Sequence, residues 1–207
     1  SHLVETGCRR VACFNASMRL EISKNRYNGY CDALLKHGIK VDPSLVFQCD
    51  NRLDAERIMP EVLDRHDRPD AFFAVNDDTA IGILYSAKRK GFRIPEDISV
   101  CGFTNGQRAV ACDPALTTVD QHGFKVGEAA AEILMRHVEG HIEKGKIERR
   151  VVRTRLVVRD STRPIATSIT EQLARTLPKE TDTAHNNGKD LDKRPQASEE
   201  SKAQQTA

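Results

Sequence analysis

The sequence predicts an α/β fold in which a mostly parallel sheet is flanked by helices. Short apolar runs alternate along the chain with longer segments whose apolar residues recur at helical spacing. Strands that alternate with helices are joined by right-handed crossovers, which produce parallel strands with helices on both faces. The apolar runs are nearly continuous, as expected for strands that are buried on two sides.

The first half of the chain contains three predicted strands and two of the helices between them. Gly38 is a stop signal for the first helix, and Asp54 is placed to cap the second. Pro60 must kink that second helix or restart it, because proline cannot donate the helical hydrogen bond. The predicted strands are residues 9–14, 44–50 and 70–77, and the predicted helices are residues 25–39 and 53–66.

The second half continues the same alternation. A helix over 78–92 ends at Gly91, and residues 94–103 form a turn followed by the fourth strand. Residues 115–121 form a fifth extended segment. A long amphipathic helix over 123–140 follows, and a final strand over 148–162 is long enough to be bent.

The two ends of the chain differ from this core. The opening "SHLVETG" is typical of the last turn of a helix capped by Gly7, without the features of a signal peptide or an initiator methionine. We therefore expect the chain to begin inside a longer protein. Residues 165–207 lack aromatic side chains and are rich in polar and charged residues, which predicts a disordered polar tail.

Charge and cysteine content exclude several classes of protein. The chain has 32 Lys and Arg residues and 30 Asp and Glu residues. The net charge of +2 is too small to indicate a nucleic-acid-binding surface. No apolar stretch is long enough to span a membrane, so no membrane partner is expected. The six cysteines form no C-x-x-C pair, and several lie in or beside predicted strands, which favours a reduced, cytoplasmic setting.

Motifs for enzymatic or metal chemistry are missing. The sequence contains no phosphate-binding loop, dinucleotide fingerprint, G-x-S-x-G or H-E-x-x-H motif, so neither an enzyme nor a cofactor is predicted. His137 and His141 lie near a helix end, but two histidines without a third ligand are a weak metal site. Protonated histidines near a helix C-terminus stabilise the helix without any metal, because their charge interacts favourably with the helix dipole.

Polar residues recur where the predicted strands end. Ligands of parallel α/β sheets bind beyond the carboxyl ends of the strands, so these side chains can converge on one crevice. Arginine offers a fork of donors, and amide side chains offer both a donor and an acceptor, which suits a polyhydroxylated small molecule. An aromatic residue such as Phe14, Tyr27 or Phe103 could support the apolar face of a sugar. The candidate ligand-binding residues are Arg26, Asn76, Asp77, Thr104, Asn105 and Gln121.

Each of these residues also has a purely structural explanation. Asp77 or Asp78 could cap the following helix, and Arg26 could be solvated. Thr104 and the two residues after it could be only a turn, and Gln121 could satisfy backbone groups at a crossover. Their occurrence together, at matching strand ends, favours a ligand site over these four separate structural roles.

Several segments carry a resemblance to a known family. "RPDAFFAVNDDTAIGILYSAKRKGFRIPEDISVCGFTN", "DPALTTVDQHGFKVGEAAAEIL" and "TRLVVRDSTRP" resemble the effector-binding domain of LacI/GalR-type transcriptional regulators. "HLVETGCRRVACF" and "RYNGYCDALLKHGIKVDPSLV" resemble two earlier parts of the same domain. The resemblance covers residues 1–164 in order, with the motifs at the expected spacings.

The resemblance implies a cytoplasmic, homodimeric regulator, a repressor, that meets operator DNA through an N-terminal helix-turn-helix absent from this chain. Its periplasmic-binding-protein-like core has two lobes and binds a small effector, a sugar or a similar molecule, between them. By the family pattern, residues 7–120 and 151–163 form the second lobe, and residues 123–150 form part of the first. The helix within 123–140 would then expose apolar surface here.

The resemblance also implies roles for individual residues. Arg26 matches the arginine of an R-x-x-G-[FWY] motif that contacts effector hydroxyls or carboxylates, and Asn76 matches the asparagine of an N-D motif. Gln121 matches a crossover residue that often lines the pocket. Thr104 departs from the pattern, because many members have an aspartate there that binds the effector, so bidentate recognition by a carboxylate is not expected at this position.

Two other functions compete with this interpretation. A periplasmic solute-binding protein for a sugar transporter would share the fold, but the six cysteines and residues 94–121 favour the regulator. An α/β enzyme could use the same crevice, and it would need a nucleophile or an acid/base pair that the sequence does not reveal.

Overall fold

The computed structural model describes residues 1–143 and 145–165, and these contain one six-stranded sheet. The strand order is β2-β1-β3-β4-β5-β6; neighbours from β2 through β5 are parallel, and β6 is antiparallel to β5. The predicted mostly parallel sheet is therefore confirmed. Most of the expected tail, residues 166–207, lies outside the described residues. The strands are β1 Val11–Asn15, β2 Val46–Gln48, β3 Ala71–Ala74, β4 Ser99–Thr104, β5 Thr117–Asp120 and β6 Arg155–Val157.

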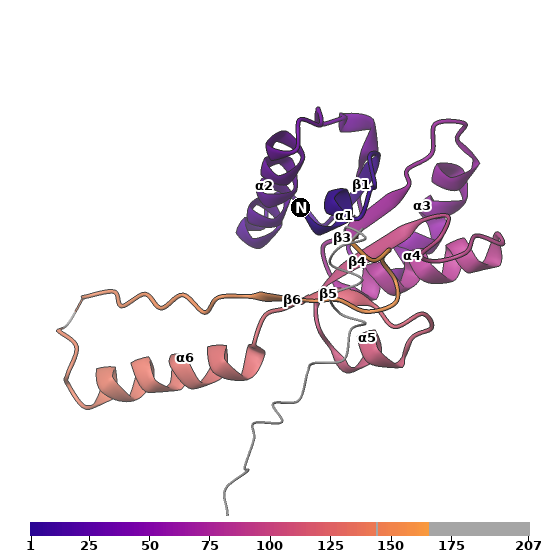
Figure 1. Ribbon diagram of the computed structural model, residues 1–207. Helices are drawn as coiled ribbons and strands as arrows, with labels where there is room; N and C mark the ends of the chain where they lie inside the picture. Colours follow the sequence, from indigo (N-terminus) through magenta and orange to yellow (C-terminus); the bar gives the residue numbers. More distant parts are fainter. Residues whose placement is uncertain (144, 166–207) are drawn as a thin grey trace, which may run out of the picture. The chain divides into compact units, whose positions relative to one another are not determined.

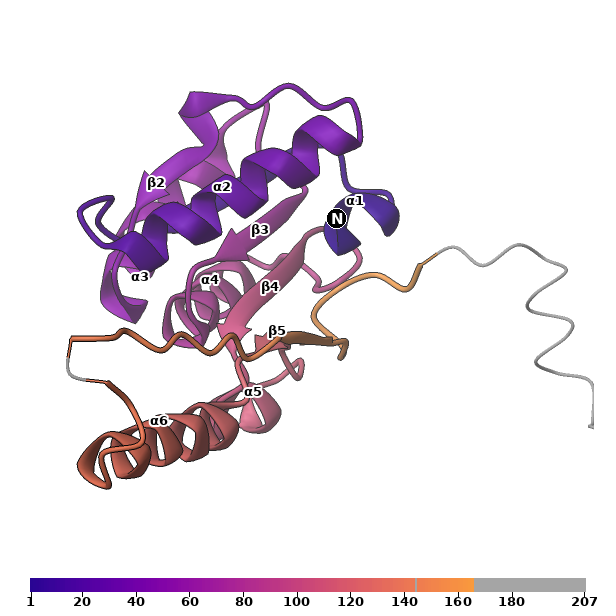
Figure 2. The same ribbon diagram turned by 90° about the vertical axis from the view of Figure 1, so that its left-hand side faces the viewer.

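Helices lie on both faces of the sheet. α2 lies over one face, with the short α1 beside it, and α3 and α4 cover the opposite face (Figures 1 and 2). This is the arrangement that alternating strands and helices produce. The helices are α1 His2–Glu5, α2 Glu21–Lys36, α3 Arg52–Asp64, α4 Asp77–Arg89, α5 Gln107–Ala111 and α6 Gly123–Val138, and a 3₁₀ turn, η1, spans Pro43–Leu45.

The larger hydrophobic core lies between the sheet and helices α3 and α4. Alternate residues of a strand point to opposite faces, so Phe72 enters this core whereas Phe73 packs on the other side of the sheet. Phe72 meets Phe14 edge to face, with ring centroids 5.9 Å apart. Met59 of α3 and Ile83 of α4 are completely buried against them.

A smaller core lies on the other face, beneath α2. Leu34 of α2 is buried there together with Val11 and Cys13 of β1. The hydroxyl of Tyr30 donates a hydrogen bond of 2.9 Å to the carbonyl oxygen of Val11, which anchors α2 to the first strand. The sheet is therefore packed on both faces, as its nearly continuous apolar strands predicted.

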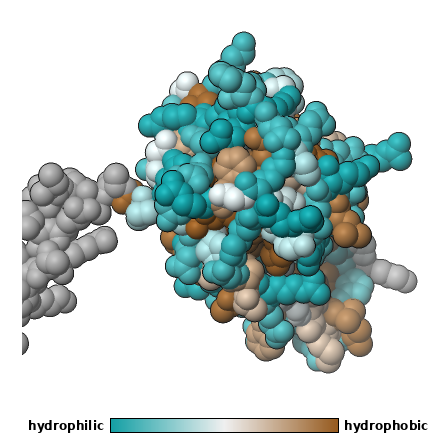
Figure 3. Space-filling view, turned by 90° about the vertical axis from the view of Figure 1, so that its right-hand side faces the viewer, coloured by the Kyte–Doolittle hydropathy of each residue, from teal (hydrophilic) through white to brown (hydrophobic). Residues whose placement is uncertain are grey.

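The outer surface on the side of α3 and α4 is mainly hydrophilic, with smaller hydrophobic areas between the polar side chains (Figure 3). Tyr85 of α4 is partly exposed, and the guanidinium groups of Arg52 and Arg89 lie 5.1 and 5.6 Å from its ring centroid. Such cation–π contacts cover the ring face while the charges remain in water. The two helices are amphipathic, as their sequence periodicity indicated.

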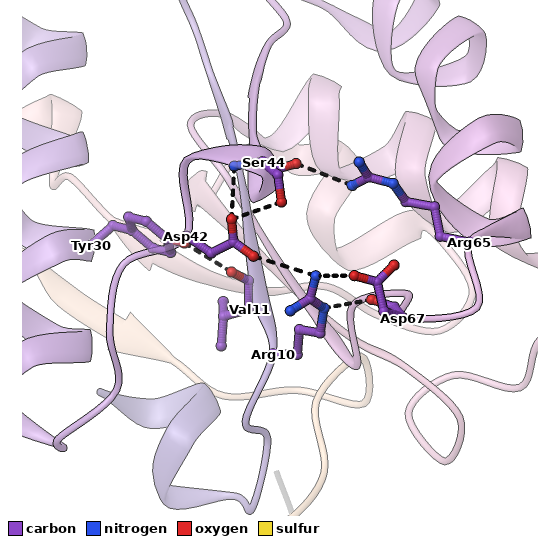
Figure 4. Close-up of polar contacts among 7 residues, drawn as sticks. All are labelled: Arg10, Val11, Tyr30, Asp42, Ser44, Arg65 and Asp67. Atoms are coloured by element: carbon purple, nitrogen blue, oxygen red, sulfur yellow. Dashed lines mark hydrogen bonds and ion pairs between the residues drawn. The ribbon is translucent and has the colours of Figure 1, made fainter.

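A polar network joins the loops at the amino ends of the strands (Figure 4). Arg10, just before β1, forms ion pairs with Asp67 at 2.6 Å and with Asp42 at 3.4 Å. Asp42 also accepts the backbone N–H of Ser44 at 2.9 Å, and Arg65 donates to the carbonyl oxygen of Ser44 at 3.1 Å. Exposed pairs of this kind each contribute about 1 kcal/mol or less, so the network mainly sets the path of the loops.

The structure corrects one detail of the predicted helices and decides between two alternatives for another. The cap of α3 is Asn51, whose side-chain oxygen accepts the N–H of Asp54, so Asp54 is not the cap. The helix also runs through Pro60 as one element and does not restart there. Asn51 decides where α3 starts, because its side chain reaches an N–H group of the first turn that has no partner within the helix.

The predicted final strand over 148–162 is wrong in length, since β6 spans only Arg155–Val157. β6 lies at the edge of the sheet and pairs only with β5, which is itself short. A strand can continue only as far as a neighbour supplies hydrogen-bonding groups. The short helix α5 was not predicted at all, because its single turn carries too little periodicity to be recognised.

The helix α6 and the segment that returns from it lie side by side, away from the sheet (Figures 1 and 2). Arg136 of α6 forms an ion pair of 2.7 Å with Glu148 of the returning segment, and Arg150 pairs with Glu132. None of the described α6 side chains is buried, and Phe124 is 82% exposed, which confirms the expected apolar exposure. None of the described helices has the length and apolar character needed to cross a lipid bilayer.

Candidate functional site

A cavity of about 550 Å³ lies between α2 and the sheet, and its lining includes residues at the carboxyl ends of the strands. Most of its lining is apolar. Its polar groups at the carboxyl end come from Asn25 and Arg26 of α2 and from Gln121, which follows β5. The apolar lining side chains of the sheet are Val11, Phe73, Cys101, Phe103, Val119 and Leu156.

Arg26 is a half-buried cation at this end of the cavity. Its Nη1 donates a hydrogen bond of 2.6 Å to the carbonyl oxygen of Val75, and its guanidinium carbon lies 4.1 Å from the ring centroid of Phe103. Burial lowers the pKa of this guanidinium, although arginine remains charged at neutral pH. Within residues 1–143 and 145–165, no carboxylate pairs with Arg26, so its other N–H groups are available to a ligand.

Thr104 and Gln121 lie together at the ends of two neighbouring strands. The side-chain amide of Gln121 donates a hydrogen bond of 3.2 Å to the hydroxyl of Thr104. The parallel register that places Thr104 opposite Asp120 accounts for this contact between residues distant in sequence. Thr104 is exposed, so its hydroxyl can still donate to a ligand.

Asn105, also a predicted ligand residue, is engaged by the chain itself. Its side-chain oxygen accepts a hydrogen bond of 2.6 Å from Nη2 of Arg159, which lies just after β6. The Nη1 of Arg159 donates at 2.7 Å to the carbonyl oxygen of Leu116, just before β5. The residue that follows Thr104 is therefore tied to the segment returning from α6.

Asn76 is the cap of α4, a role that the sequence assigned to Asp77 or Asp78. The side-chain oxygen of Asn76 accepts the N–H of Thr79 at 2.8 Å, and its nitrogen donates to the carbonyl oxygen of Asp50 at 3.3 Å. Asn76 can be the cap because a cap residue has an extended backbone, whereas Asp77 already lies within the helix.

Asp77 is buried, with 6% of its surface exposed, and both carboxylate oxygens are occupied. Oδ1 accepts the hydroxyl of Thr118 at 2.5 Å, and Oδ2 accepts the backbone N–H of Gly106 at 2.9 Å. A ligand that bound Asp77 directly would have to displace one of these donors.

The structure thus places Arg26, Thr104 and Gln121 at the carboxyl ends of the strands. The side chains of the other candidates form hydrogen bonds with other parts of the chain. Among the aromatic candidates, Phe103 lines the cavity, but Phe14 is completely buried in the larger core and cannot face a ligand. Sequence reasoning missed Thr118 and Arg159. The available signal for Thr118 was a pair of threonines in an otherwise apolar strand, "ALTTVDQ".

The cap supplies a direct test of the assignment of Asn76. Replacing Asn76 by alanine is expected to lower the free energy of unfolding by about 1 kcal/mol, because the N–H of Thr79 loses its acceptor. Asn76→Ser keeps a side-chain oxygen that can accept this N–H, so it should retain most of the stability. Urea unfolding of both variants measures the difference, and equal stability of Asn76→Ala and the parent chain would contradict this role.

The described residues offer little for metal or nucleophilic chemistry. Within them, no group of three or more His, Cys, Asp and Glu side chains could hold a metal ion. All six cysteines are free, and burial raises the pKa of Cys13 and Cys101 to about 12. These two thiols therefore stay protonated, and unreactive as nucleophiles, at neutral pH.

Residues 1–162 match the family model of the periplasmic binding protein-like domain. Among curated proteins, the chain is 34% identical over 167 residues to the HTH-type transcriptional repressor CytR of Escherichia coli (strain K12), covering 80% of this chain and 48% of CytR. It is 34% identical over 142 residues to the repressor PurR of Vibrio atlanticus (strain LGP32), covering 67% and 42% of the two chains. The chain spans about half the length of these relatives.

Solved structures show the same similarity. A transcriptional regulator CelR–cellobiose complex superimposes with a TM-score of 0.72 and 32% identity, covering 77% of this chain and 49% of that one. A LacI-family regulator from Sanguibacter keddieii superimposes with a TM-score of 0.69 and 35% identity, covering 77% and 60%. The family match over residues 1–162 includes the strand ends that carry the candidate site.

Proposed function

Because the chain belongs to the periplasmic binding protein-like family, in the form found in the effector-binding domain of LacI-type transcriptional regulators, we propose that it forms one wall of an effector site. The effector is a carbohydrate or a similar polar small molecule. The complete protein is a cytoplasmic homodimer that represses transcription and meets operator DNA through an N-terminal helix-turn-helix.

The observation that carries this proposal is the combination of groups at the carboxyl ends of the strands, three of which line the cavity: Arg26, Phe103 and Gln121. Arg26 presents N–H donors above the ring of Phe103, and Thr104 and Gln121 present a hydroxyl and an amide nearby. Hydroxyl-rich molecules need several donors and acceptors at one edge and an apolar surface against their carbon atoms. The similarity to a regulator solved with cellobiose supports a carbohydrate.

The second wall of the site comes from another lobe. Residues 7–120 and 151–163 form the lobe with the sheet, and residues 123–150 contribute to the other. This division is supported by α6, whose described side chains are not buried against the sheet. The effector favours one arrangement of the two lobes, and its different affinity for the two arrangements changes how the paired DNA-binding parts sit on a two-fold operator.

Replacing Arg26 by alanine is expected to weaken effector affinity about tenfold or more, because the ligand loses a charged donor in a half-buried site. The measurement is calorimetric titration of the protein expressed from its complete reading frame. The ligands are cellobiose, other mono- and disaccharides, nucleosides and nucleobases. Arg26→Lys should recover only part of the affinity, since an ammonium cannot present the planar fork.

Arg57→Ala is the matched control for Arg26→Ala. Arg57 lies on α3, its side chain is 77% exposed, and its carboxylate partner is Asp54 on the same helix. Its replacement should leave effector affinity unchanged. Equal affinity of the Arg26→Ala and parent proteins for a ligand that binds would remove Arg26 from the site.

The DNA upstream of the Ser1 codon separates the regulator from the solute-binding alternative. An in-frame helix-turn-helix followed by a first lobe would support the regulator. A secretion signal followed by a first lobe would instead support a periplasmic solute-binding protein for a sugar transporter. An enzyme using the same crevice would need a reactive group, and the buried thiols described above do not provide one.

A further inference from the structure

The turn that follows β4 has an unusual backbone. Thr104 has φ 146° and Asn105 has φ 59°, so two consecutive residues other than glycine lie in the left-handed half of conformational space. Each such residue is strained, and a threonine is especially so because it is branched at Cβ. Strain of this kind persists only where the surrounding structure holds the backbone in place.

Arg159 holds the side chain of Asn105, and the backbone of the turn is held by Asp77 and Thr118. Thr118 Oγ1 accepts the backbone N–H of Asn105 at 3.3 Å and donates its own proton to Oδ1 of Asp77 at 2.5 Å. The other carboxylate oxygen of Asp77 accepts the backbone N–H of Gly106 at 2.9 Å. Two consecutive N–H groups of the turn are therefore held by one linked pair of side chains.

This pair is closely packed. Thr118 is completely buried, and Asp77 lies directly against β4 at Gly102. A Cβ at Gly102 would be 2.5 Å from Oδ1 of Asp77 and 2.9 Å from a methyl carbon of Leu116, so only glycine leaves room for the carboxylate. The carboxylate thus has one position in which both of its oxygens are hydrogen-bonded.

From these contacts we propose that Asp77 and Thr118 are positioning residues: they set the strained turn so that Thr104 stands beside Gln121 at the effector site. The link to effector recognition rests on the proposed function, whereas the link to the turn rests on the contacts alone. Asp77 then acts by holding the backbone of the turn and does not touch the ligand. Its carboxylate is therefore not available to the effector.

Two substitutions of Thr118 separate positioning from simple packing. Thr118→Val keeps the size and the methyl group but removes the hydroxyl, whereas Thr118→Ser keeps the hydroxyl and removes the methyl group. Amide hydrogen exchange of the ¹⁵N-labelled 207-residue chain, followed by NMR, reports on the turn without any ligand. The reference is the N–H of Val75, which donates to the carbonyl oxygen of Phe14 on the other side of β3.

The valine variant is expected to speed exchange of the Asn105 N–H at least fivefold relative to Val75, and the serine variant is expected to leave it near the parent rate. Asp77→Ala should speed exchange at Gly106, because its N–H then loses its acceptor. Unchanged exchange at both positions in Thr118→Val, or equal acceleration in the valine and serine variants, would overturn the proposal.

Effector titration of the complete protein provides the second readout. For whichever saccharide, nucleoside or nucleobase binds the parent, Thr118→Val should weaken affinity about tenfold and Thr118→Ser should not. If exchange changes as expected but affinity does not, the turn is positioned for a role other than binding this ligand, and the link to recognition is wrong. If no ligand binds the parent, the proposed function fails while exchange still decides the positioning role.

Discussion

Replacing Phe72 by alanine is expected to lower the free energy of unfolding by about 3–5 kcal/mol, the usual cost of removing a buried phenylalanine. Phe72 is completely buried between the sheet and helices α3 and α4, and its ring meets Phe14 at an angle of 65°. The neighbouring Met59 and Ile83 belong to rigid, packed helices, so they cannot collapse fully into the space that the ring leaves.

Phe73→Ala is the matched control, because Phe73 is the next residue of β3 and points to the opposite face. Phe73 is only partly buried and lines the open cavity, so its removal takes fewer contacts from the chain. Urea unfolding monitored by circular dichroism should show a clearly smaller loss for Phe73→Ala. Equal losses for the two variants would mean that the face toward α3 and α4 is not the main source of stability.

Replacing Gly82 by valine is expected to cost about 3 kcal/mol, at the upper end of the usual range for overpacking. Gly82 lies in α4 where that helix passes close to α3. A Cβ there would be 2.6 Å from the carbonyl oxygen of Arg52 and 2.8 Å from Cβ of Ala55. Both atoms belong to the backbone or to its first side-chain carbon, so only movement of a whole helix could relieve the clash.

Gly127→Val provides the control, since Gly127 also lies within a helix, α6, but a Cβ added there would meet no atom of a neighbouring element within 4 Å. Valine and glycine differ by only a few tenths of a kcal/mol in helix propensity, so this variant should be nearly neutral. Thermal unfolding of the two variants side by side makes the comparison. A loss at Gly127 as large as that at Gly82 would show that close helix packing is not the cause.

Local periodicity was enough to predict most of the elements. The apolar run around Phe72 and the helical spacing of Tyr30 and Leu34 are properties of neighbouring residues, and burial acts on them in the same way in any parallel α/β sheet. The edge at which Arg26, Thr104 and Gln121 meet was also predictable, because parallel strands all end at the same side of a sheet. Sequence pattern could therefore predict where these side chains lie, and their role in binding stays a prediction.

The roles within that site needed the structure. Asn76, Asp77 and Asp78 are adjacent polar residues, and nothing in their order tells which one caps α4 and which one turns inward to Thr118. That choice depends on the backbone angles where β3 ends and on the space left by Gly102 in the neighbouring strand. Both are set by parts of the chain that lie far apart in sequence.

The sequence alone determined the α/β class, the order of strands and helices, and the edge that carries the candidate site, because these follow from hydrophobic periodicity and strand direction. Only the tertiary structure decided the length of β6, the strained turn at Thr104 and Asn105, and the burial of Asp77. Each of these depends on what a distant segment offers: a neighbouring strand to pair with, a hydroxyl to accept an N–H, or room for a carboxylate.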